Sequence, residues 1–209
     1  MCRAYRSDVI AQIKAFDWNF TDHGDEQLVE MFRAAKVFCF DLCMSILSPD
    51  KHPSYWLTFL GASETGKTHL AHGIYRFFKQ HVSETFIPVL GFKKRQLEER
   101  EGEFHVATEI GKDAIQQHGL LRRLSALNLL IIDELDPNVS KLEKDQVCKL
   151  ISWRSGAGTT PFKWTVMTSN LTREQVATEL DPRIASRLRR ENNVIIDLAE
   201  DITAHLDRS

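Results

Sequence analysis

The stretch GASETGKT, residues 61–68, decides how this chain is interpreted. It fits the pattern G-x-x-x-x-G-K-[ST]. The apolar run Trp56–Leu60 precedes it and predicts a short buried strand, and the stripe Leu70, Ile74 and Phe77 after it predicts a helix. A glycine loop between a strand and a helix turns backbone N–H groups toward a phosphate, and the positive helix end adds to the attraction. The motif in this context predicts a phosphate-binding loop.

The residue types of the loop indicate a nucleoside triphosphate with its metal ion. Lys67 is expected to reach the β- and γ-phosphates, and the Thr68 hydroxyl is expected to coordinate Mg²⁺, which prefers oxygen ligands. Glu64 is unusual because it places an acid inside an anion-binding loop, so its side chain must point away from the phosphates. The predicted ATP-binding residues are Gly61, Ala62, Ser63, Glu64, Thr65, Gly66, Lys67, Thr68 and His69.

Two acids follow a second apolar run about seventy residues downstream. Leu129–Ile132 predicts a buried strand that delivers Asp133 and Glu134 to the edge of the sheet where ligands bind. Asp133 is expected to hold Mg²⁺. Glu134 is expected to orient and deprotonate the attacking water, a task that needs a base near the γ-phosphate.

Polar residues after two later elements extend this candidate site. Asn170 follows the predicted strand Phe162–Thr168 and is expected to help position the water; the alternative is a helix cap, although Thr172 and Gln175 already form a capping-box pattern. The stretch from Asp181 to Arg190 carries four arginines. Such a stretch is often a solvated helix face, but an arginine that stabilises transition-state charge is the functional alternative.

The order of the elements predicts an α/β fold with a parallel five-stranded sheet covered by helices on both faces. Pro88 favours an edge position for the second strand, because proline cannot donate to a ladder. The expected strands are 56–60, 86–90, 127–132, 162–168 and 193–197, and the expected helices are 25–47, the helix after the glycine loop, 93–100, 113–124, 142–153, 173–180 and a short one from Asp181.

The net charge and the cysteine content limit the partners and the location expected for this chain. The formal net charge of −2 gives no global reason for nucleic-acid binding, so any DNA contact must come from a local patch such as 93–95 or 122–123. The four cysteines are too few for a disulfide framework, and no apolar run suggests a membrane span, so a cytoplasmic location is expected. Cys39 and Cys43 could share a metal by their spacing, but buried packing is the simpler interpretation.

These motifs together resemble the AAA+ ATPases, and among them the DnaC-type helicase loaders and the IstB-type transposition helper ATPases. The resemblance covers roughly residues 14–200 and rests on the tokens GKTHLA (66–71), IIDEL (131–135), TSNL (168–171) and SRL (186–188), in that order.

The resemblance implies a role for each of these residues. Lys67 and Thr68 are similar to the Walker A pair, Asp133 and Glu134 to the Walker B pair, and Asn170 to sensor 1. Arg187 is similar to an arginine finger that serves a neighbouring subunit. The resemblance therefore implies a homo-oligomer, contact with single-stranded DNA, and a replicative helicase or transposase as partner.

The chain departs from the family pattern in three places. Glu64 stands where the family usually has glycine. The chain ends about twelve residues after the last predicted strand, so the helical lid is expected to be truncated or absent. The segment 1–24 is too short for a separate helicase-binding domain, which leaves 25–209 as the expected ATP-binding domain.

Three functional hypotheses follow from the sequence. The first is an ATP-hydrolysing protein that assists DNA replication or transposition. The second is a nucleotide-gated partner-binding module with little turnover. The third, a small-molecule phosphotransferase, lacks a segment that clearly supplies an acceptor site.

Overall fold

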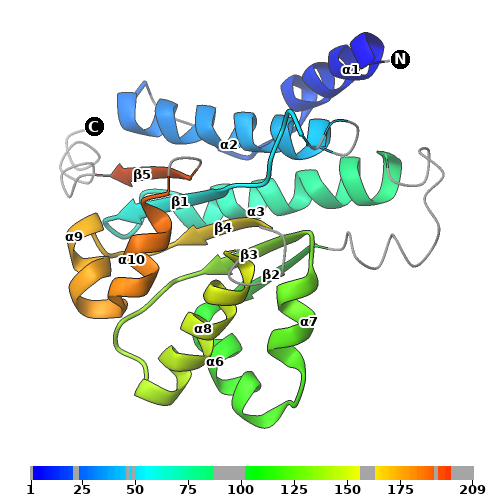
Figure 1. Cartoon of the computed structure of the whole chain (residues 1–209). Coiled ribbons are helices and arrows are strands. Elements are labelled where there is room, and N and C mark those ends of the chain that lie inside the picture. Colours follow the sequence, from blue (N-terminus) through cyan, green and yellow to red (C-terminus); the bar gives the residue numbers. More distant parts are fainter. Residues whose placement is uncertain are drawn as a thin grey trace.

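A parallel sheet of five strands forms the centre of the computed structural model. The strands lie in the order β2-β3-β4-β1-β5, and each neighbouring pair is parallel (Figure 1). The structure describes residues 2–20, 24–45, 48, 50–86, 102–155, 163–190 and 193–198. The strand bounds are β1 Trp56–Gly61, β2 Gly102–Val106, β3 Leu129–Asp133, β4 Trp164–Thr168 and β5 Val194–Leu198.

Helices cover both faces of this sheet (Figure 1), which confirms the predicted architecture. One face carries α1 (Cys2–Ala15), α2 (Glu26–Ser45), α3 (Lys67–Phe77) and the π-helix η1 (Phe78–Phe86). The other carries α6 (Ala107–Gln116), α7 (Leu120–Ala126), α8 (Lys141–Arg154), the π-helix η2 (Val176–Leu180) and α10 (Pro182–Leu188), and a short helix α9 (Arg173–Gln175) leads into η2.

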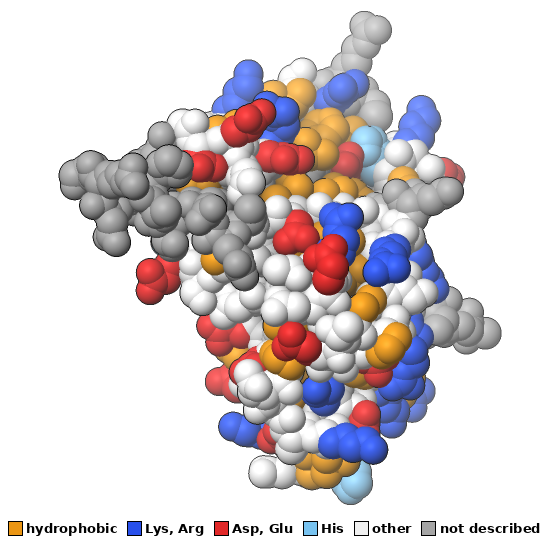
Figure 2. Space-filling view, turned by 90° about the vertical axis from the view of Figure 1, so that its left-hand side faces the viewer, with side chains coloured by type: hydrophobic (Ala, Val, Ile, Leu, Met, Phe, Trp, Pro, Cys, Tyr) orange, Lys and Arg blue, Asp and Glu red, His pale blue; other side chains and the backbone are white. Residues whose placement is uncertain are grey.

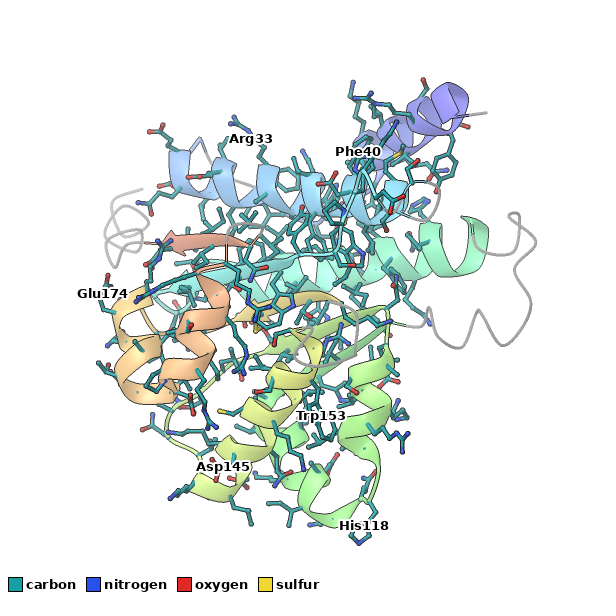
Figure 3. The ribbon with its side chains drawn as sticks, in the orientation of Figure 1. Arg33, Phe40, His118, Asp145, Trp153 and Glu174 are labelled. Atoms are coloured by element: carbon teal, nitrogen blue, oxygen red, sulfur yellow. The ribbon has the colours of Figure 1, made fainter. Side chains whose placement is uncertain are left out.

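Alternation along the strands divides the core into two clusters. Leu57 and Phe59 of β1 pack on the α2 and α3 side, whereas Trp56 and Leu60 pack on the α8 side. Side chains fill the space between α2 and the sheet and between the sheet and α8 (Figure 3). Since both faces are buried, the strands read as continuous apolar runs in the sequence.

The edge strand beside β3 is not the one predicted from residues 86–90. Phe86 ends the helical segment η1, and residues 87–90 lie outside the described residues. The edge position belongs instead to β2, where Glu103 and His105 are bonded to each other and Phe104 stacks on His72 of α3. This strand was missed because its two-residue alternation is short and its outward residues are charged or polar.

The remaining predicted strands, and the predicted helices 25–47 and 142–153, differ from the observed elements only in their bounds. The helix predicted over 113–124 consists of two helices, α6 and α7, separated near Gly119, whose φ of 91° is left-handed. The predicted helix 93–100 and the expected lid truncation after β5 fall outside the described residues and stay predictions.

The segment before α2 contains a helix that the sequence analysis did not predict. Val9 and Ile13 of α1 and Trp18 after it are buried in the same cluster as α2 and α3. Trp18 stacks on Phe77 with 5.9 Å between ring centroids, and its ring limits the space beside Gly73 of α3. In this segment α1 therefore packs against α2, and Trp18 packs against α3.

The surface carries both signs of charge. In the view of Figure 2, acidic and basic side chains are interspersed, with Lys and Arg gathered along one side. Among the described residues, no helix combines the length and apolar character needed to cross a bilayer. No group of three His, Cys, Asp or Glu side chains able to hold a metal was found among these residues, and Cys39 and Cys43 are buried free thiols.

A buried arginine joins the end of α8 to α7 and β4. Arg154 is fully buried, and its guanidinium donates to Leu124 O and Leu127 O at 2.9 Å each and to Thr165 Oγ1 at 3.0 Å. It also donates to Trp164 O. Burial lowers the pKa of Arg154 to about 9, so the group is still charged at neutral pH. Arg154 therefore satisfies carbonyls that α7 and its following turn leave without helical partners.

We expect Arg154→Leu to lower the free energy of unfolding by at least about 2 kcal/mol, because it leaves several buried carbonyls unsatisfied. Urea denaturation measures the change. The matched control is Arg189→Leu, at an exposed position, with an expected change within about 0.5 kcal/mol. Equal losses in the two variants would contradict this role for Arg154.

Candidate functional site

The glycine loop between β1 and α3 needs two residues without a Cβ. Gly61 has φ 112°, and a Cβ there would lie 2.0 Å from the carbonyl oxygen of Leu198. Gly66 has φ 82°, and a Cβ there would lie 2.9 Å from the ring of Phe20. Gly66 also places no side-chain cap on α3, so the first N–H groups of that helix are left to a ligand. The loop thus has the form expected of a phosphate cradle.

Lys67 lies inside this loop and is only 5% exposed. Its ammonium donates to Gly61 O at 2.9 Å, to Thr65 Oγ1 at 3.2 Å and to Ala62 O. Burial lowers the pKa of Lys67 to about 8, and the nearby Asp133 carboxylate opposes that shift. The loop therefore holds a mostly charged ammonium at neutral pH, at the place where the sequence predicts a triphosphate.

Two of the predicted metal ligands meet across the sheet. Thr68 Oγ1 donates to Asp133 Oδ1 at 3.1 Å, although the two residues are far apart in the sequence. Asp133 is the last residue of β3 and is 2% exposed. A hydroxyl and a carboxylate that converge in this way are the oxygen donors that Mg²⁺ prefers, so these residues fit such an ion.

Glu134 follows with an unusual backbone. Its φ is 55°, in the left-handed region that residues with a side chain rarely adopt, and its side chain is exposed. Its N–H donates to Thr168 Oγ1 at 2.9 Å. The Glu134 side chain is therefore exposed to solvent directly after the buried Asp133 in the chain.

Asn170 lies at the same edge of the sheet, after β4, and is exposed. The residue that contacts both acids is Thr168, which the sequence analysis did not select. Its hydroxyl donates to Asp133 Oδ1 at 2.5 Å in addition to accepting from Glu134. In the sequence, Thr168 stands out only as a polar residue at the end of a predicted strand and as the first residue of the TSNL token.

Arg187 is not brought to the phosphate loop of its own chain. Its Nε donates to Ser155 Oγ at 3.1 Å, beyond the end of α8. Its carbonyl accepts from Asn193 Nδ2, and Asn193 Oδ1 accepts from the N–H of Trp56, the first residue of β1. These contacts hold Arg187 near the edge where the strands begin, whereas the loop starts at the other end of β1, about 17 Å away for five residues of strand.

Glu64 and His69, the two remaining notable residues of the loop, are exposed. Glu64 has φ 63°, so the position adopts the left-handed conformation that glycine adopts at no steric cost. The departure from the family pattern thus places a residue with a strained backbone in the loop, and its side chain is exposed.

We expect Glu64→Gly to raise the free energy of unfolding by up to about 1 kcal/mol, because relief of a left-handed penalty of roughly 1–2 kcal/mol outweighs the unfolded-chain entropy that glycine adds, about 0.4–1 kcal/mol. The neighbouring exposed Ser63 has no positive φ, so Ser63→Gly should lower stability by roughly 0.5–1 kcal/mol through unfolded-chain entropy. Thermal and urea unfolding of the two variants check the opposite signs. A loss of stability in both would show that Glu64 carries no strain.

No model of a known protein family matches the chain, and no curated protein matches its sequence. The crystal structure of the DnaC helicase loader aligns with a TM-score of 0.57 and 18% identity, over 83% of this chain and 90% of the loader chain. The replication initiator DnaA bound to AMPPCP and single-stranded DNA aligns with a TM-score of 0.57 and 12% identity, over 88% of this chain and 50% of that one.

Domain III of the Thermotoga maritima replication initiation protein DnaA aligns with a TM-score of 0.50 and 15% identity, over 75% of this chain and 59% of that chain. The chain therefore spans most of the DnaC loader but little more than half of these DnaA chains. At these identities the likeness concerns the fold. The chain shares the α/β fold of the DnaC helicase loader and of the replication initiator DnaA, as the predicted order of strands and helices implied.

Proposed function

We propose that this protein binds and hydrolyses Mg-ATP and acts in DNA replication as a helicase-loader-like protein, or in transposition. The observation that carries the proposal is the 3.1 Å contact between Thr68 Oγ1 and Asp133 Oδ1 beside a buried Lys67. A lysine, a hydroxyl and a carboxylate at the mouth of a glycine loop match the needs of a triphosphate and its metal. The fold shared with DnaC and DnaA supports a replication role.

The residues divide the chemistry among them. The backbone N–H groups of the loop and the Lys67 ammonium bind phosphate oxygens, and Thr68 and Asp133 would hold Mg²⁺. Bound Mg²⁺ would neutralise charge on the β- and γ-phosphate oxygens. Glu134, which is exposed beside Asp133, orients the attacking water and accepts its proton, and Asn170 helps to position that water.

Two single substitutions test this division. Lys67→Ala should weaken Mg-ATP binding at least about tenfold, because it removes the buried ammonium of the cradle. Glu134→Gln should keep binding but lower turnover by roughly 10²–10⁴-fold, because it removes the base. Fluorescent-nucleotide titration and steady-state ATPase assays, each with and without single-stranded DNA, measure both quantities.

The same assays separate the alternatives. Stimulation of turnover by single-stranded DNA supports the DNA-associated ATPase. Tight Mg-ATP binding with negligible turnover of the unaltered chain would favour the nucleotide-gated partner-binding module. Unchanged Mg-ATP affinity in Lys67→Ala would refute the proposed nucleotide site itself.

We further propose that the active form is a homo-oligomer in which Arg187 of one copy serves the nucleotide of the next. Support comes from the contacts of Arg187 with Ser155 and Asn193, which lie at the opposite edge of the sheet from the phosphate loop. Arg187 and a phosphate loop can then come together only when two copies meet. The partner that such an oligomer acts on is a replicative helicase or a transposase.

Arg187→Ala should lower turnover by roughly 10³-fold while ATP binding persists, because the negative charge on the γ-phosphate in the transition state loses the guanidinium that stabilises it. Mixing it with Glu134→Gln should restore part of the turnover, since intact Glu134 and intact Arg187 then meet between copies. Exposed Arg189→Ala is the matched control and should retain turnover. Full activity of Arg187→Ala, or a mixture no more active than its parts, would rule out a shared site.

A further inference from the structure

The hydroxyl of Thr168 lies between the two acids of the candidate site. Thr168 is 1% exposed at the end of β4, and Oγ1 donates to Asp133 Oδ1 at 2.5 Å while it accepts the Glu134 N–H at 2.9 Å. A hydroxyl has one hydrogen and two lone pairs. Its single hydrogen therefore goes to Asp133, and one lone pair is used by Glu134.

Backbone contacts strengthen the same connection. The N–H of Leu135 donates to Thr168 O at 2.9 Å, and Ser169 Oγ donates to Leu135 O at 2.7 Å. Residues 133–135 are thus bonded at successive positions to residues 168 and 169. The left-handed backbone of Glu134 lies in the middle of this segment, so its conformation is fixed from both sides.

The chain after Thr168 also holds the start of the phosphate loop. Ser169 N–H donates to Phe59 O at 3.0 Å, and Gly61 N–H donates to Leu171 O at 3.1 Å. Residues 168–171 therefore contact the acids on β3 and the end of β1 together. A displacement of this segment changes the distance between the acids and the loop.

We infer that Thr168 is a positioning residue. It orients the Asp133 carboxylate for metal binding, and it fixes the Glu134 backbone so that the Glu134 carboxylate can reach the attacking water. The inference rests on the proposed ATPase function. Thr168 Oγ1 donates to Asp133 Oδ1 and accepts from the Glu134 N–H. Loss of this hydroxyl therefore alters metal binding and turnover together. Outer partners of metal ligands are typically worth about 10–100-fold in metal affinity or activity.

The test compares Thr168→Val with Thr58→Val. Both threonines are buried in adjacent strands, but the Thr58 hydroxyl has no hydrogen-bond partner among the described residues. Thr168→Val should lower kcat about 10–100-fold with a smaller change in KM, and it should raise the Mg²⁺ concentration needed for half-maximal binding of a fluorescent ATP analogue. Thr58→Val should change neither quantity, and Thr168→Ser should restore both to within about threefold.

Each remaining outcome has a definite meaning. Thr168→Val with normal turnover and normal Mg²⁺ dependence would overturn the inference and leave the ATPase proposal standing. Equal losses in Thr168→Val and Thr58→Val would overturn it as well, because they would report strand packing. If the unaltered chain neither binds nor hydrolyses ATP, the proposed function is wrong, and the inference about Thr168 is then wrong as well.

Should Thr168→Val not fold, Thr168→Cys serves in its place, since a thiol is a much weaker donor. The expected result is then a partial loss of turnover with a raised Mg²⁺ requirement. Unaltered values for this variant would overturn the inference.

Discussion

The contact between Thr68 and Asp133 has to be made across a strand that carries neither residue. Thr68 follows β1 and Asp133 ends β3, and β4 lies between these two strands. Two strand spacings separate β1 from β3 by about 10 Å. The carboxylate and the hydroxyl can meet only above the end of β4, so whatever residue ends β4 decides whether the site closes.

The end of β4 meets this constraint with small polar residues. Thr168 and Ser169 have short side chains, and both donate hydrogen bonds to the segment at the end of β3, Thr168 to Asp133 and Ser169 to Leu135. Their backbone groups continue the same pattern, because Ser169 N–H bonds to β1 while Thr168 O bonds to the segment after β3. Hydrogen bonds thus connect the ends of β1, β4 and β3, and the geometry of the site follows from the order of these strands.

Strand order also explains what the sequence could and could not predict. The phosphate loop was predictable because its motif is contiguous and its flanking elements are adjacent in the chain. Asp133 and Glu134 were predictable because they end an apolar run. Thr168 was not, since its role depends on β4 lying between β1 and β3, which no local pattern encodes. The edge strand β2 was missed for a related reason: its Glu103 pairs with Arg123 of α7, and that pairing exists only in the folded chain.

Two side-chain-bearing residues of the site, Glu64 and Glu134, adopt left-handed backbone. Such conformations cost roughly 1–2 kcal/mol and persist where surrounding bonds over-determine them. For Glu134 those bonds are present, because Thr168 and Ser169 fix the residues on both sides. The proposed chemistry also needs its carboxylate to be exposed, and Glu134 is exposed. Glu64 has an exposed side chain at a position where glycine adopts the same backbone at no steric cost, so only at Glu134 does the strained backbone carry a group that the proposed chemistry uses.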